Sequence, residues 1–146
     1  MALVDKPKLG IVDLTDCEGC QVEFFSLKDR LPKLWQKFEI VSWRMAQDYS
    51  NLDQLDILLI EGTPISQEDR LKVEMIRKKT RYLGTLGSCA DLGGINAILQ
   101  GRQRDQAFKR VYKKNRPTGR EVKPLESYVK IDFRIPGCPI RPDYLA

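Results

Sequence analysis

The 146-residue chain contains no histidine. This absence excludes a Ser-His-Asp triad, a Cys-His dyad and any zinc site with a histidine ligand within the chain. Long hydrophobic runs are also missing, because the longest apolar stretch covers only residues 57–60, far short of a membrane helix. No apolar segment of signal-peptide length follows Met1. The sequence therefore predicts a cytoplasmic protein without membrane insertion.

The overall composition is that of a globular protein, with 42% hydrophobic and 31% charged residues. The length suits one domain that buries its own core without disulfides, and we expect a single domain over residues 1–146. There are four cysteines, and in a reducing compartment we do not expect them to pair as disulfides. Their placement along the chain therefore becomes the main question.

One segment, residues 101–124, differs from the rest in charge. It has only two acidic residues and only two aromatic ones, Phe108 and Tyr112, too few to suggest base stacking. We interpret it as a basic insertion, either a solvated segment with a helix near residues 106–113 or a docking surface for an acidic partner, and not as a nucleic-acid site. Its nine basic residues are Arg102, Arg104, Lys109, Arg110, Lys113, Lys114, Arg116, Arg120 and Lys123.

Short apolar runs alternate with segments of helical periodicity, which predicts parallel βαβ units in a doubly wound α/β sheet with helices on both faces. Ser66 and Asp69 form a capping-box pattern, and Pro32 is expected to end the first helix. The expected strands cover residues 8–14, 39–43, 56–61, 81–86 and 127–135, and the expected helices cover residues 21–31, 66–79 and 90–99.

The cysteines follow predicted strands. Cys17 and Cys20 form a C-x-x-C pair after the first strand, Cys89 follows the fourth, and Cys138 follows the last. The carboxyl ends of parallel strands share one edge, so the four thiolates are expected to meet there. Four thiolates suit a 4Fe–4S cluster or an all-cysteine zinc site, but structural zinc usually takes two close ligand pairs and the chain has one. A zinc module, a redox dithiol and buried structural cysteines remain as alternatives.

Backbone N–H groups beside Gly19 and Gly137 are expected to face the sulfur atoms, and the hydroxyls of Ser88 and Thr15 are further candidate donors. Hydrogen bonds of this kind tune the potential of an iron–sulfur cluster.

Four motifs in sequence order resemble those of the small subunits of nickel–iron hydrogenases, a superfamily that includes the 20 kDa subunit of NADH:ubiquinone oxidoreductase. The resemblance implies a flavodoxin-like domain in which Cys17, Cys20, Cys89 and Cys138 hold the proximal 4Fe–4S cluster, beside the nickel–iron centre of a separate large subunit. The motifs are Asp16-Cys17-Glu18-Gly19-Cys20, Glu61-Gly62-Thr63, Gly87-Ser88-Cys89-Ala90 and Ile135-Pro136-Gly137-Cys138-Pro139.

The form of the first motif separates two branches of this superfamily. Complex I subunits of this type have two adjacent cysteines there, whereas this chain has C-x-x-C. The resemblance therefore implies the compact, one-cluster type found in soluble NAD(P)-linked hydrogenases and sulfhydrogenases. Such a chain is not catalytic alone. It would relay electrons from hydrogen to iron–sulfur/flavin (diaphorase) subunits that carry FMN and NAD(P), with the basic segment as a docking face. The alternative is a complex I-like electron-transfer subunit without hydrogenase activity.

Two carboxylates near the cysteines, Glu61 and Glu18, are candidates for a proton relay, because hydrogen splitting must export protons as well as electrons. Glu61 is the first candidate, because a carboxylate at the end of an apolar strand is unusual and suggests a specific role. The competing interpretation is a structural carboxylate that caps the turn at Gly62 and Thr63.

Overall fold

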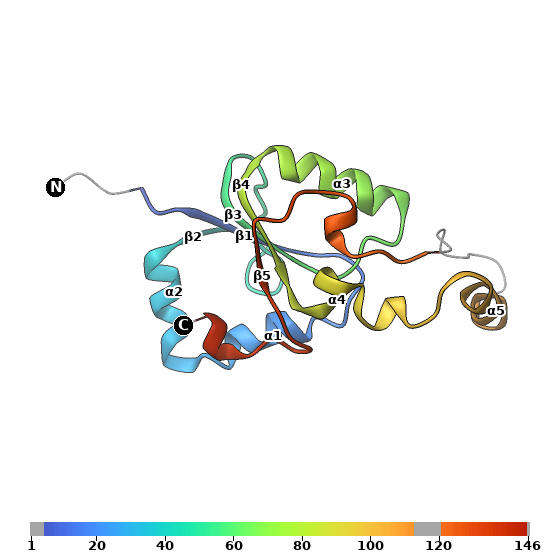
Figure 1. Ribbon diagram of the computed structural model, residues 1–146. Coiled ribbons are helices and arrows are strands. Elements are labelled where there is room, and N and C mark those ends of the chain that lie inside the picture. Colours follow the sequence, from blue (N-terminus) through green and yellow to red (C-terminus); the bar gives the residue numbers. More distant parts are fainter. Residues whose placement is uncertain (1–4, 113–120, 146) are drawn as a thin grey trace.

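A computed structural model describes residues 5–112 and 121–145. Its described strands form one parallel sheet with the order β2-β1-β3-β4-β5 (Figure 1). This order is that of flavodoxin-like doubly wound folds, which confirms the predicted fold class. The strands are β1 (Lys8–Asp13), β2 (Glu39–Trp43), β3 (Leu55–Glu61), β4 (Thr80–Leu86) and β5 (Phe133–Ile135).

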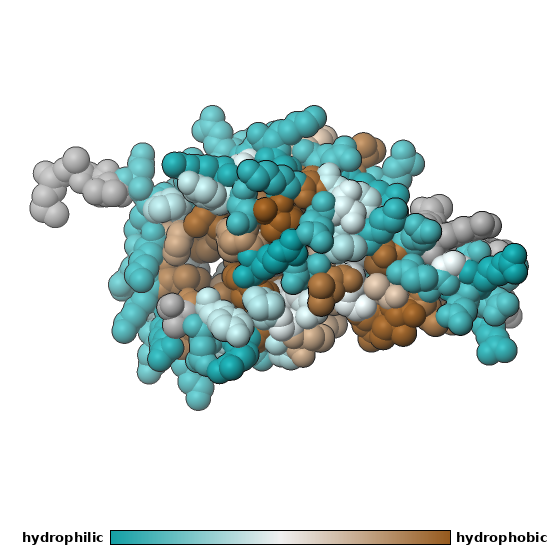
Figure 2. Space-filling model, viewed as in Figure 1, coloured by the Kyte–Doolittle hydropathy of each residue, from teal (hydrophilic) through white to brown (hydrophobic). Residues whose placement is uncertain are grey.

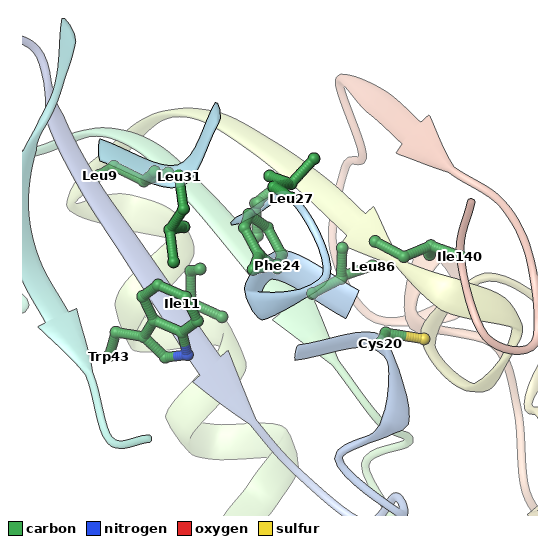
Figure 3. Packing of buried hydrophobic residues seen from close by; sticks show 10 residues of the cluster. Leu9, Ile11, Cys20, Phe24, Leu27, Leu31, Trp43, Leu86 and Ile140 are labelled. Carbon is green, nitrogen blue, oxygen red and sulfur yellow. The ribbon is translucent and has the colours of Figure 1, made fainter. Parts of the chain in front are cut away.

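Two hydrophobic clusters cover the two faces of the sheet. Neighbouring residues of β1 belong to different clusters, Ile11 to one and Val12 to the other, because side chains alternate along a strand. The first cluster joins β1 to α1 and α2, and Figure 3 shows Cys20 at its end opposite Trp43. The second joins the sheet to α3 and α4. The helices are α1 (Gly19–Phe25), α2 (Leu31–Lys37), α3 (Gln67–Lys78), α4 (Gly87–Leu92) and α5 (Gly101–Val111).

Helix boundaries differ from the sequence expectations at two places. Pro32 lies in the first turn of α2 and does not end the preceding helix. Proline suits that position because its missing N–H has no partner inside the helix there. The turn expected after β4 is part of a helix, because α4 begins at Gly87. This helix ends before Gly93, whose φ of 86° is left-handed. Cys89 therefore lies inside a helix. The capping box of Ser66 and Asp69 is confirmed at the start of α3.

The last strand is much shorter than expected. Only Phe133–Ile135 pair with β4, and a 3-10 helix covers Leu125–Ser127 instead. The Asp132 carboxylate accepts the Leu83 N–H at 2.9 Å. In a longer strand, a backbone carbonyl of that strand would accept this N–H group instead. Arg77 pairs with the same carboxylate.

The basic segment is described only in part, because residues 113–120 lie outside the described residues. Its first half forms α5, longer at its start than expected. Arg102, Lys109 and Arg110 are exposed, whereas Arg104 is buried, so Arg104 does not belong to a solvated or docking face. None of the helices in the part of the chain that the structure describes is long and apolar enough to cross a membrane.

Candidate metal centre

Strands β1, β3, β4 and β5 end at the same edge of the sheet, which we call the carboxyl edge. The segments after β1, β4 and β5 leave the sheet there, and each of them has a cysteine within four residues of its strand. Parallel pairing places these strand ends side by side, as the sequence predicted for the loops. The paired row is Asp13, Glu61, Leu86 and Ile135.

The four cysteines differ in exposure. Cys20 lies in the first turn of α1 and Cys89 in the first turn of α4, and both are buried. Cys17 and Cys138 lie in loops and are exposed. All four are free thiols. The arrangement thus has two sulfur atoms inside the fold and two at its surface.

The thiols lie close enough to influence one another. Burial raises the pKa of Cys89, and the nearby charges of Cys138 and Cys17 raise it further. Burial likewise raises the pKa of Cys20 to about 12, with further contributions from Glu61 and Cys89. Cys89 is therefore electrostatically coupled to each of the other three cysteines. Within residues 5–112 and 121–145, no three histidine, cysteine or acidic side chains are arranged to hold a single metal ion.

Two glycines leave space at the buried sulfur atoms. A Cβ at position 87 would lie 2.3 Å from the Sγ of Cys20, and one at position 94 would lie 2.6 Å from the Sγ of Cys89. Both glycines have positive φ, at +80° and +51°. Only glycine combines this backbone conformation with an open approach to sulfur. The sequence singled out Gly87 within a motif but gave no reason to select Gly94.

Backbone N–H groups contact the same two sulfur atoms. Ile140 donates to the thiol of Cys20 and Ile95 to that of Cys89, and each bond lowers the pKa against the effect of burial. Neither donor was expected from the sequence, because isoleucine carries no signal for a backbone contact. Hydrogen bonds to the charged form of sulfur favour that form.

Ser88, one of the two hydroxyl residues proposed as donors, donates to a backbone carbonyl instead of to sulfur. The N–H and Oγ of Ser88 both donate to the carbonyl of Gly137, at 2.8 and 3.0 Å. The N–H of Thr63 donates to the carbonyl of Thr15 at 3.0 Å, and the Thr63 hydroxyl donates to the Cys89 carbonyl at 2.8 Å. Both sets of bonds tie the cysteine-bearing loops to one another and do not contact sulfur.

Glu61 is buried, with 2% of its surface exposed. Its Oε1 accepts the N–H of Cys20 at 3.0 Å and its Oε2 accepts that of Gln21 at 3.1 Å. Glu61 thus caps α1, 40 residues away in sequence, and not the turn at its own end of β3. The helix needs this cap because Glu18, at its N-cap, is left-handed and makes no side-chain cap. Gln21 in turn accepts a hydrogen bond from Trp43 Nε1 at 3.0 Å.

Two further carboxylates lie between β1 and α1, and their surroundings differ from those of Glu61. The Glu18 side chain is 40% exposed and forms an ion pair with Arg44. Asp16, which the sequence analysis named only as part of the first motif, accepts the Glu18 N–H through Oδ1, while its Oδ2 is buried without a hydrogen-bond partner in the described residues. Burial raises the pKa of Asp16 to about 6.

A family model described as NADH ubiquinone oxidoreductase, 20 Kd subunit, matches residues 17–146. The chain belongs to this family. Relatives include the delta subunit of sulfhydrogenase 2 from Pyrococcus furiosus, 35% identical over 90% of this chain and 56% of the relative. Another is the delta subunit of the NAD-reducing hydrogenase HoxS from Cupriavidus necator, 24% identical over 92% of this chain and 72% of the relative. The gamma subunit of the coenzyme F420 hydrogenase from Methanosarcina barkeri is 29% identical over 98% of this chain and 52% of the relative.

The chain spans about half the length of most of these relatives. Among solved structures, an NAD+-reducing [NiFe]-hydrogenase matches with a TM-score of 0.81 and 23% identity, over 96% of this chain and 86% of that one. The Ni-Fe-Se hydrogenase of Desulfomicrobium baculatum matches with a TM-score of 0.68 and 16% identity, over 97% of this chain and 59% of that one. These solved structures therefore share the fold of this chain.

We predict that Glu61→Gln lowers the free energy of unfolding by about 2 kcal/mol, because an amide accepts through one oxygen and turns its NH2 toward the second N–H donor. Urea unfolding followed by tryptophan fluorescence measures the change. The matched control is Glu39→Gln, an exposed glutamate at the start of β2, which should shift stability by less than about 0.5 kcal/mol. Equal stability of the two variants would contradict the capping role of Glu61.

Proposed function

We propose that this chain is the electron-transfer small subunit of a [NiFe] hydrogenase and that it holds a 4Fe–4S cluster at the carboxyl edge. The observation that carries the proposal is that four free cysteines follow three strands that end at the same edge of the sheet. Cys17, Cys20, Cys89 and Cys138 would be the ligands, which is the number that such a cluster requires. When bound, the cluster would accept and release electrons one at a time.

The chain's own groups fit a bulky anionic sulfur site. Gly87 and Gly94 keep the space beside the buried sulfur atoms free of side chains. The N–H groups of Ile95 and Ile140 stabilise negative charge on sulfur, which would raise the reduction potential of a bound cluster. The Glu61 carboxylate fixes the backbone at Cys20 and so holds its sulfur in place.

A redox dithiol would use Cys17 and Cys20 alone, and it would not account for Cys89 and Cys138 at the same edge of the sheet. Burial raises the pKa values of Cys20 and Cys89, so a cation would be needed to hold both as thiolates. Iron would supply that positive charge. A zinc module is also less well supported, since structural zinc usually takes two closely spaced ligand pairs and the chain has one.

Hydrogen cleavage is assigned to a partner, because all four cysteines of this chain are used as cluster ligands. We propose a large subunit with the nickel–iron centre, and iron–sulfur/flavin subunits with FMN that deliver electrons to NAD(P)+ in the cytoplasm. The hydrogenase names of the relatives support this assembly. In the segment that follows Cys89, Leu92 is 68% exposed and Ile98 is 72% exposed, and Figure 2 shows hydrophobic atoms between α4 and α5. A large subunit that covers this surface would shield the cluster.

The proton-relay hypothesis for Glu61 and Glu18 stays a prediction. Both oxygens of Glu61 accept backbone N–H groups, and Glu18 is paired with Arg44 at the surface. These contacts give each carboxylate a structural role that does not require proton transfer.

The family description favours one second candidate, a complex I-like subunit without hydrogenase activity. The response of the purified complex to hydrogen gas distinguishes the hydrogenase assignment from the complex I-like one. In the anaerobically purified complex, H2 alone should bleach the visible absorption of the cluster if the hydrogenase assignment holds. Reduction by NADH together with no response to H2 would assign the chain to the complex I-like branch.

We predict that this chain, purified anaerobically in its complex, carries about four iron and four sulfide. Replacing any one of the proposed ligands by alanine should lower the iron content and slow electron flow to the distal acceptor, because the cluster loses a thiolate. Iron and sulfide analysis with visible absorption measures both. One zinc per chain without sulfide would overturn the assignment, and a normal cluster in Cys138→Ala would remove that ligand.

A second prediction compares two glycines with the same backbone requirement. Gly87→Ala places a methyl group against the sulfur of Cys20, whereas nothing lies within 4 Å of a Cβ at Gly101, where φ is +51°. Both alanines should cost about 1–2 kcal/mol for the left-handed backbone. Only Gly87→Ala should also lower the iron content. If both variants, or neither, lose iron, steric space at the sulfur is not what Gly87 provides.

A further inference from the structure

A cavity of about 490 Å³ lies beside the 3-10 helix Gly94–Ala97. Its walls come from that segment, from α5, from the start of α3 and from Thr15 in the loop after β1. The volume falls within the range of about 300–1,000 Å³ that is usual for small-molecule sites. Figure 1 shows α5 set apart from the sheet, beyond α4. The lining residues that matter here are Asp69, Ile95, Leu99, Arg104, Phe108 and Tyr112.

Arg104 is an unusual wall residue because it is 6% exposed. Its Nη1 donates to the carbonyl of Asn96 at 2.9 Å, and its Nε is buried without a hydrogen-bond partner in the described residues. Arg104 also forms no ion pair with a carboxylate of the residues that the structure describes. A buried charge is costly unless it is paired and hydrogen-bonded, so this guanidinium calls for an anion.

The nearby parts of the chain do not supply that anion. Asp69 lines the cavity, but its Oδ2 accepts the N–H groups of Ile65 and Ser66 at 3.1 and 2.9 Å. Residues 113–120, which follow the last lining residue, contain no aspartate or glutamate. The partner for Arg104 therefore comes from outside these segments.

Much of the remaining wall is apolar, with a few polar side chains among the apolar ones. Arg104, Phe108 and Tyr112 follow one another at intervals of four along α5 and its C-cap, with the guanidinium 4.5 Å from the Phe108 ring centroid. The Phe108 and Tyr112 rings meet edge to face at 5.7 Å. Ile95 and Leu99 add aliphatic surface from the segment before α5. A few polar groups in a mainly apolar wall are the usual composition of a small-ligand pocket.

The position of α5 is fixed by its neighbour Gln100. The Gln100 side chain accepts the N–H of Val122 at 2.9 Å and donates to the Val122 carbonyl at 3.0 Å. Val122 is itself buried. This two-way bond holds the helix against the chain that returns after residue 120, so the pocket is largely formed before a ligand enters.

We propose that this cavity binds a small organic carboxylate with an apolar body, free in solution. The carboxylate pairs with the guanidinium of Arg104, and the apolar body packs against Phe108 and Leu99. None of the four cysteines lines this cavity, and the proposal does not depend on the proposed cluster.

Phenylacetate is a suitable probe, measured by equilibrium dialysis with the full chain, purified anaerobically with any subunits that accompany it. We expect saturable binding, and at least about tenfold weaker binding of phenylacetamide, which lacks the charge. Arg104→Met should weaken phenylacetate binding by a similar factor. The matched control Arg102→Met changes an exposed arginine of the same helix and should leave binding within about twofold of the unmodified protein.

A second variant covers the case in which Arg104→Met does not fold. Leu99→Trp fills the cavity from its partly exposed wall and leaves Arg104 in place, so it should abolish phenylacetate binding. The proposal is overturned if phenylacetate shows no saturable binding, if phenylacetamide binds equally well, or if a folded Arg104→Met or Leu99→Trp variant binds as the unmodified protein does.

Discussion

The Glu61 carboxylate joins the end of a buried strand to the first turn of α1 by accepting two backbone N–H groups. A seven-residue helix without its own side-chain cap has little intrinsic stability, and this pair of bonds holds it in place. The helix carries Cys20, whose sulfur faces Gly87 at the start of α4. The geometry around both buried cysteines therefore depends on a carboxylate at the carboxyl edge, and the parallel register puts it there.

Much of the fold follows from local sequence. Apolar runs predicted the long strands, and the Ser66 and Asp69 pattern predicted the start of α3. The rule for parallel strand ends predicted that the cysteine-bearing segments follow strands ending at one edge of the sheet. The failures share a physical origin in contacts between distant residues. The Asp132 carboxylate shortened the last strand by taking a donor of β4, and Glu61 capped a helix 40 residues away. Neither contact leaves a local pattern in the sequence.

The two buried cysteines and the two exposed ones imply a site with an inner and an outer side. Inside, glycines and backbone N–H groups meet the sulfur atoms of Cys20 and Cys89. Outside, Cys17 and Cys138 lie at the surface. Electron transfer needs a cluster held rigidly yet close to its partners, and in the proposed function this division would provide both. The 3-10 helix Gly94–Ala97 serves two sites, since Ile95 donates to the Cys89 sulfur and also lines the Arg104 cavity.

The central claim is that the carboxyl edge holds a four-iron cluster between these cysteines. Crystals of the anaerobically purified protein, measured above and below the iron absorption edge, test it directly. The account predicts one compact iron peak in the anomalous map, bounded by the sulfur atoms of Cys17, Cys20, Cys89 and Cys138. A map without iron at this position, or with a single zinc ion in its place, would contradict it.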